Sequence, residues 1–177
     1  APYELAAALA AGGFDRCSTA SNHSNDTGPA GIASTLDALD AAGLSHTGTA
    51  RTPDEAEPRV FTVGGVRVAH LAYTRSWNTD LPRDRWMLAS VTTPEQVAAD
   101  VATVRSAGAE IVIVSLHLGT EMQTGPTGAD RTFATTLTSG AHVSGWVPQA
   151  AVDPDIARMP TANAPRPSAG EYESDFL

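Results

Sequence analysis

The sequence predicts an α/β protein in which a layered sheet is flanked by helices. Segments with helical apolar periodicity alternate with short apolar runs along the 177 residues. Two apolar arms separated by Gly64-Gly65 predict a β-hairpin, and the unbroken β-branched run of residues 111–116 predicts a buried strand. Sheets of this kind bind ligands at the carboxyl ends of their strands. Polar residues at strand ends are therefore the candidates for function.

Four segments have the apolar spacing of amphipathic helices, namely residues 2–11, 31–42, 93–107 and about 128–138. In the first segment Leu5 and Leu9 share one face, and Gly12 begins the stop signal. In the third segment Thr93 is placed to cap the helix, Pro94 suits its first position, and a valine stripe follows.

Short apolar runs predict five strands, namely residues 14–20, 44–48, 59–63, 66–74 and 111–116. The arm 66–74 is nearly continuously apolar, which is typical of a strand covered on both faces. A long polar loop, residues 75–90, follows this arm.

The chain divides into a core, residues 1–147, and a Pro-rich tail, residues 148–177. Five of the twelve prolines lie between residues 148 and 170, where the periodicity fades. This composition predicts a tail that lies along the surface or is partly disordered.

The composition excludes several classes of function. The net charge of −9 argues against binding to a nucleic-acid backbone or to anionic lipid. All eleven basic residues are arginine, which excludes Schiff-base and P-loop lysine chemistry. The single cysteine, Cys17, excludes an internal disulfide and a Cys-rich zinc site. No apolar run reaches the length of a membrane span, and no leader peptide is expected within these residues.

Two predicted strands end in residues that suit catalysis or metal binding. After the first strand, Asn22 offers an amide oxygen to a hard cation, His23 offers a ligand or a general acid, and Asp26 offers a carboxylate. The alternative is a loop whose Asn and Asp side chains satisfy turns. The strand 111–116 delivers His117 to its end, with Glu121 four residues later. The alternative there is a histidine paired with a backbone carbonyl.

The remaining histidines are weaker candidates. His70 lies inside a hairpin arm, where a structural role is expected, and His46 lies beside a turn and is expected at the surface. His142 follows Gly140 and is placed to point into the same cleft as the strand ends.

The chain resembles the CapA family of bacterial capsule-synthesis proteins, whose core is similar to the calcineurin-like metallophosphoesterases. The matching stretches follow the family's order and are residues 13–26, 35–43, 65–74 and 113–121. The last of them fits the family's His-x-Gly-x-Glu motif, and the resemblance covers roughly residues 3–147.

This resemblance implies a metal-dependent hydrolase that acts on a phosphate ester or an amide-linked polymer in poly-γ-glutamate capsule synthesis. Divalent Mn, Fe or Zn would be held by Asn22, His117 and His142. His23, with Asp26, would act on the reacting group, and Glu121 would contact substrate. No nucleic acid is expected as a partner.

The resemblance also implies departures from the family. The family's first strand, with a Gly-Asp metal motif, would lie ahead of Ala1, and residues 140–149 match the final Gly-His-x-His motif only in altered form. We therefore expect the site to be completed by an N-terminal segment or by another capsule-synthesis subunit. The alternatives are a non-catalytic subunit of the assembly and one fragment of a processed hydrolase. The implied location is the cell surface, with membrane attachment through a segment outside this sequence.

The polar loop 75–90 is a candidate substrate-facing lid. It holds Arg75 and Trp77, which are expected to contact substrate, and also Arg83, Arg85 and Trp86. The alternative is a solvated excursion that the two tryptophans pin to the core.

Overall fold

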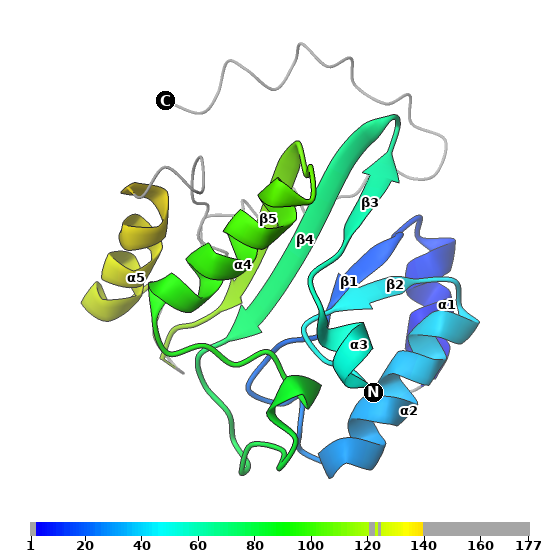
Figure 1. Cartoon of the computed structure of the whole chain (residues 1–177). Helices are drawn as coiled ribbons and strands as arrows, with labels where there is room; N and C mark the ends of the chain where they lie inside the picture. The colour runs from blue at the N-terminus through cyan, green and yellow to red at the C-terminus, as the bar shows by residue number, and fades with distance from the viewer. Residues whose placement is uncertain (1–2, 121–122, 124, 140–177) are drawn as a thin grey trace.

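A computed structural model describes residues 3–120, 123 and 125–139 (Figure 1). The strands are β1 (Arg16–Ser18), β2 (Ser45–Thr47), β3 (Val60–Val63), β4 (Val66–Thr74) and β5 (Ile111–His117). The helices are α1 (Glu4–Ala11), α2 (Gly28–Ala41), α3 (Pro53–Ala56), η1 (Arg85–Met87), α4 (Pro94–Ser106) and α5 (Gly128–Ser139). The mixed α/β architecture is confirmed, and the short helices α3 and η1 were not predicted.

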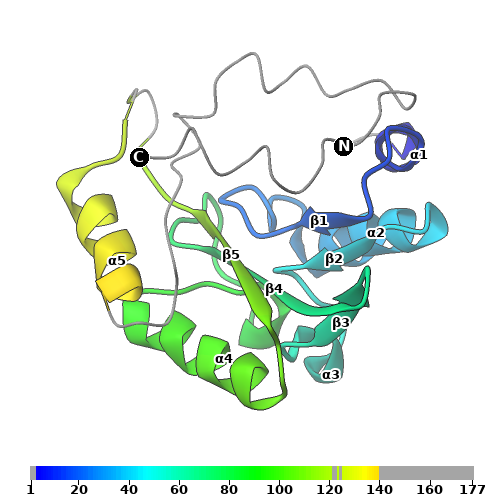
Figure 2. The ribbon, with the colours of Figure 1, turned by 90° about the horizontal axis from the view of Figure 1, so that it is seen from above.

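The N-terminal part is a small α/β unit. Strands β1 and β2 pair in parallel, with Arg16 opposite Ser45, and α1 and α2 lie beside them (Figures 1 and 2). Their apolar cluster contains Ala6, Ile32, Leu36, Leu39, Leu44 and Met87. Of the two leucines that were predicted to share a face of α1, Leu9 packs against this cluster, whereas Leu5 is 48% exposed and its neighbour Ala6 is buried.

The second part is a three-stranded sheet in the order β3-β4-β5. The predicted hairpin is confirmed: β3 and β4 are antiparallel, and Val63 pairs with Val66 across a two-residue turn. Gly64 and Gly65 have φ of 56° and 89°, which glycine adopts without the steric cost that a β-carbon brings. Strand β5 then pairs with β4 in parallel, from Val68 opposite Ile111 to Thr74 opposite His117.

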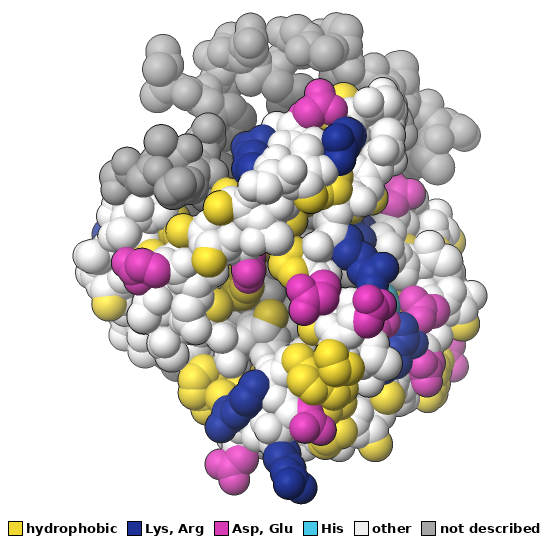
Figure 3. All heavy atoms as spheres, viewed as in Figure 1, with side chains coloured by type: hydrophobic (Ala, Val, Ile, Leu, Met, Phe, Trp, Pro, Cys, Tyr) yellow, Lys and Arg dark blue, Asp and Glu magenta, His cyan; other side chains and the backbone are white. Residues whose placement is uncertain are grey.

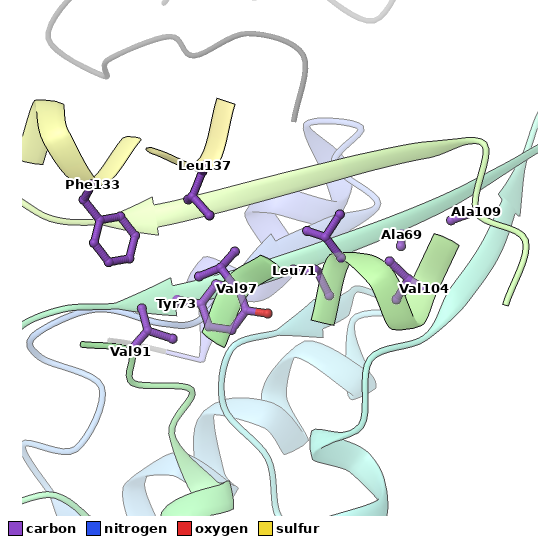
Figure 4. Close-up of a cluster of buried hydrophobic side chains, with 10 residues drawn as sticks. Ala69, Leu71, Tyr73, Val91, Val97, Val104, Ala109, Phe133 and Leu137 are labelled. Atoms are coloured by element: carbon purple, nitrogen blue, oxygen red, sulfur yellow. The ribbon is translucent and has the colours of Figure 1, made fainter. Parts of the chain in front are cut away.

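The helix α4 covers one face of this sheet and forms the main core with α5 (Figures 2 and 4). The predicted valine stripe is confirmed, since Val97, Val101 and Val104 are at most 1% exposed. They pack against Leu71 and Tyr73 of β4, and Phe133 and Leu137 of α5 complete the cluster. The N-terminus of α4 carries the predicted cap, in which Thr93 and Gln96 form a reciprocal capping box.

The prediction that β5 is a buried strand was wrong. Ile111 and Ile113 are about half exposed, at 48% and 50%. In the described sheet β5 is an edge strand, and only its alternate side chains Val112, Val114 and Leu116 pack against the core. The β-branched run therefore indicated a preference for extended backbone and did not indicate burial on both faces.

We expect Leu36→Ala to lower the free energy of unfolding by about 2–5 kcal/mol, because the fully buried side chain would leave a cavity. Leu5→Ala is the matched control, since it removes the same atoms from an exposed position and should cost under about 1 kcal/mol. Urea unfolding followed by circular dichroism measures both. Equal losses in the two variants would contradict the assignment of this core.

Candidate functional site

Three described strands end at one edge of the molecule. The loop 19–27 leaves β1, the loop 75–84 leaves β4, and His117 is the last residue of β5. The backbone NH of Arg75 donates to the carbonyl of His117 at 3.0 Å, which holds the ends of β4 and β5 together. This is the position where polar side chains can converge on a ligand.

The loop after β1 is a set of side-chain-stabilised turns. The Ser24 hydroxyl donates to the carbonyl of Thr19 at 2.6 Å and accepts from the backbone NH of Ser21 at 2.8 Å. These bonds fold the loop back on the end of β1 and present Asn22 and His23 to solvent. The turn-forming role expected as an alternative is thus carried largely by the serines.

His23 is held by two neighbours. Its Nδ1 lies 2.6 Å from Oδ2 of Asp26, and the side-chain amide nitrogen of Asn78 lies 3.2 Å from each of the two ring nitrogens. Because the carboxylate of Asp26 only accepts, the proton of the neutral ring belongs on Nδ1 and the lone pair on Nε2. The Nε2 atom is therefore the proton-accepting end of the ring.

Asn78 is the residue that the sequence reasoning missed. Its backbone NH donates to the carbonyl of Asn22 at 3.0 Å, and its Oδ1 accepts from the amide of Asn22 at 3.1 Å. A second link joins the same loops, since the buried Asn25 donates to the carbonyl of Asp80 at 2.7 Å. The signal was present: Asn78 follows β4 as Asn22 follows β1, and the strand-end rule applied to β4 would have found it.

His117 lies close enough to His23 for the two rings to interact electrostatically. Partial burial and then the charge of His23 lower the pKa of His117 below its usual range. The neutral imidazole, which is the form that binds metal, is favoured at pH 7. The structure thus brings Asn22, His23, Asp26 and His117 to one edge, while Glu121 and His142 lie outside the described residues.

Arg75 and Trp77, the two residues of the loop 75–90 that were predicted to contact substrate, have different surroundings. The guanidinium of Arg75 stacks on the Phe133 ring at 4.4 Å and lies 3.7 Å from Asp130, so it packs toward α5. Trp77 is half exposed and lines a cavity of about 1170 Å³ between the loop 75–90, β2, α3 and β4.

The loop 75–90 is pinned along its second half. Met87 and Leu88 are buried, and the backbone NH of Ala50 donates to the carbonyl of Met87 at 3.0 Å. Trp86 packs partly against the same cluster. This half of the loop matches the alternative expectation of a solvated excursion that is pinned to the core. Arg83 and Arg85 remain exposed.

A second cluster of possible metal ligands lies away from the strand ends. Ligand atoms of Asp40, His46 and Glu55 lie within 4.8 Å of one another. Arg51 already forms ion pairs with Asp40 and Glu55. Hydrogen bonds from Arg51 to these acids, chiefly to Glu55, raise the pKa of Arg51. The guanidinium therefore supplies the positive charge that a metal would bring. The expectation that His46 lies at the surface was wrong: its side chain is 8% exposed beside these acids.

The visible face of the molecule carries acidic and basic side chains side by side (Figure 3). Basic residues do not gather there into a continuous patch.

A comparison with protein families finds that the model described as "Bacterial capsule synthesis protein PGA_cap" matches residues 1–144. No curated protein and no solved structure matches the chain. Among the described residues, no helix has the length and apolar character needed to cross a membrane.

We expect His23→Gln to raise the pKa of His117, because the substitution removes the neighbouring charge while the partial burial remains. An NMR titration of the His117 ring measures the shift. His46→Gln, which removes a histidine beside Asp40 and Glu55, should leave that pKa unchanged. A lowered or constant pKa in His23→Gln would show that the two rings are not neighbours.

Acidification should weaken the fold through two histidines. The pKa of both His70 and His117 is lowered in the folded chain, mainly by burial. Below the unfolded-chain pKa of about 6.5, the unfolded chain therefore binds more protons than the folded chain does. The contribution is fully present above pH 6.5 and is lost as the pH falls toward the folded-state pKa. Urea unfolding at pH 7 and pH 5.5 should show this loss, and the double variant His70→Gln/His117→Gln should lose less between the two pH values. If the double variant lost as much stability between the two pH values as the wild-type chain, the effect would belong to other groups.

Proposed function

The chain belongs to the PGA_cap family of bacterial capsule synthesis proteins, and from this premise we propose that it is a metal-dependent hydrolase of capsule synthesis. Its substrate would be a phosphate ester or an amide-linked surface polymer such as poly-γ-glutamate. The observation that carries the proposal is the convergence of two separate segments at one strand-end edge, with Asn22 and His23 from the loop after β1 and His117 from the end of β5.

The donor set suits a divalent Mn, Fe or Zn ion. Imidazole nitrogen together with amide and carboxylate oxygen is the ligand chemistry of these metals. Asn22 uses its amide nitrogen to bind Asn78, and no hydrogen bond to its Oδ1 is found among the described residues. That oxygen and the neutral ring of His117 would hold the ion, which would supply an activated water and polarise the bond to be cleaved.

The role of His23 follows from its neighbours. Asp26 fixes the ring through Nδ1, while Nε2 is left to exchange a proton with the reacting group. Its side chain is 63% exposed, so substrate can reach it. Asn78 contacts both ring nitrogens through its side-chain amide and is a positioning residue.

The described residues supply a small ligand set, and a two-metal site needs more. We propose that the remaining ligands come from His142, from an N-terminal segment or from another capsule-synthesis subunit. The proposed location is the cell surface, in keeping with the family's role in capsule synthesis.

The test combines metal content with hydrolysis in the full-length chain. Elemental analysis after loading with Mn, Fe or Zn should give near-stoichiometric metal, which Asn22→Ala and His117→Ala should reduce. His23→Ala should keep the metal but lower turnover of a phosphate ester or a γ-glutamyl peptide by about 10²–10⁴-fold.

His46→Ala is the matched control for the metal site. It removes a histidine from the Asp40–His46–Glu55 cluster and should leave the metal content unchanged. Metal lost in His46→Ala but retained in His117→Ala would move the ion to that cluster and overturn the proposed site. A wild-type chain that binds no metal and hydrolyses neither substrate would favour the non-catalytic subunit.

A further inference from the structure

One arginine of the chain is buried in part without a counter-charge. Arg16, the first residue of β1, is half-buried, and its Nε is fully buried without a hydrogen-bond partner. Across the described residues its guanidinium makes no ion pair and no hydrogen bond. Its recorded contact is with the Phe61 ring, 4.7 Å away. A guanidinium carries five N–H donors, so this is an unusual environment for it.

Four of the five acids that line the same cavity belong to other partners, and the fifth, Glu57, is exposed and forms no ion pair with Arg16 among the described residues. Asp40 and Glu55 are paired with Arg51, and Asp54 is paired with Arg59. Asp100 accepts from the hydroxyl of Tyr73. Stacking on Phe61 stabilises the positive charge of Arg16 but offers no acceptor for its N–H groups.

Two further polar groups lie on the sheet face toward which Arg16 points. Phe61 pairs with Val68, so both lie on one face of the sheet, and His70 is two residues further along that face. The Nε2 of His70 lies 2.8 Å from the hydroxyl of Ser115 on β5. Arg16 and His70 line the same cavity, and burial, followed by the charge of Arg16, lowers the pKa of His70.

We propose that Arg16, His70 and Ser115 form an oxyanion-binding subsite that accepts a phosphate or carboxylate group on the sheet face opposite α4. The planar guanidinium supplies a fork of N–H donors that matches either group. His70 and Ser115 supply the second side of the subsite, and the cavity that Arg16 and His70 line gives the anion access. An anion there would supply the acceptor that Arg16 lacks.

The proposed subsite lies near the strand-end site but does not depend on it. Ser115 and His117 point to the same face of β5 and are two residues apart, which is about 7 Å along a strand. A substrate with a repeated negative charge could place one group at each position. The oxyanion subsite needs no metal, so it can be tested when the metal site is empty.

The experiment uses the full chain treated with EDTA and titrated separately with inorganic phosphate and with acetate in a calorimeter. We expect the wild-type chain to bind at least one of them with a millimolar dissociation constant. Arg16→Met, which keeps the contact with Phe61, should weaken binding by at least about tenfold. Arg85→Met is the matched control, since it removes an exposed arginine that lines the same cavity, and should change binding less than about twofold.

A second readout locates the anion in the unmutated chain. Backbone amide NMR signals of Arg16, His70 and Ser115 should shift together on titration, which keeps the test valid if Arg16→Met fails to fold. Binding of phosphate alone would identify a phosphate group as the ligand, and binding of both anions would extend the subsite to carboxylates. No binding of either anion, shifts elsewhere, or equal weakening in the two variants would overturn the proposal. None of these results bears on metal content, so the two proposals fail independently.

Discussion

The parallel pairing of β4 with β5 is the constraint on which the rest of the described structure depends. Parallel strands need a crossover on one face of the sheet, and α4 supplies it by burying Val97, Val101 and Val104 against β4. This packing fixes the register in which Thr74 lies opposite His117. A shift of one residue would turn the histidine to the opposite face of the sheet.

The strand-end site is built from loops that brace one another. Asn22 with Asn78, and Asn25 with Asp80, join the loop after β1 to the loop after β4 through side-chain and backbone hydrogen bonds. These bonds connect the N-terminal unit to the three-stranded sheet, so the site lies where the two parts meet. A capsule-synthesis protein that positions a ligand between these loops would hold it from both parts at once.

Two arginines show how differently one side-chain type is used. Arg51 is surrounded by Asp37, Asp40 and Glu55, and it neutralises a cluster that otherwise resembles a metal site. Arg16 is half-buried, and within the part of the chain that the structure describes its guanidinium pairs with no acid. Formal charge is the same in both cases, and only the arrangement of acceptors separates a structural ion-pair network from a site poised for an anion.

The sequence alone determined the order and type of the main elements, because local periodicity, capping by Thr93 and the turn at Gly64-Gly65 act within a few residues. It also placed Asn22, His23 and His117 at strand ends. It did not determine burial of β5, since the exposure of Ile111 and Ile113 depends on which strands flank them. Nor could it find the buried environment of His46 or the contact between Arg16 and Phe61. These depend on segments far apart in the chain, and only tertiary packing brings them within hydrogen-bonding or Coulombic range.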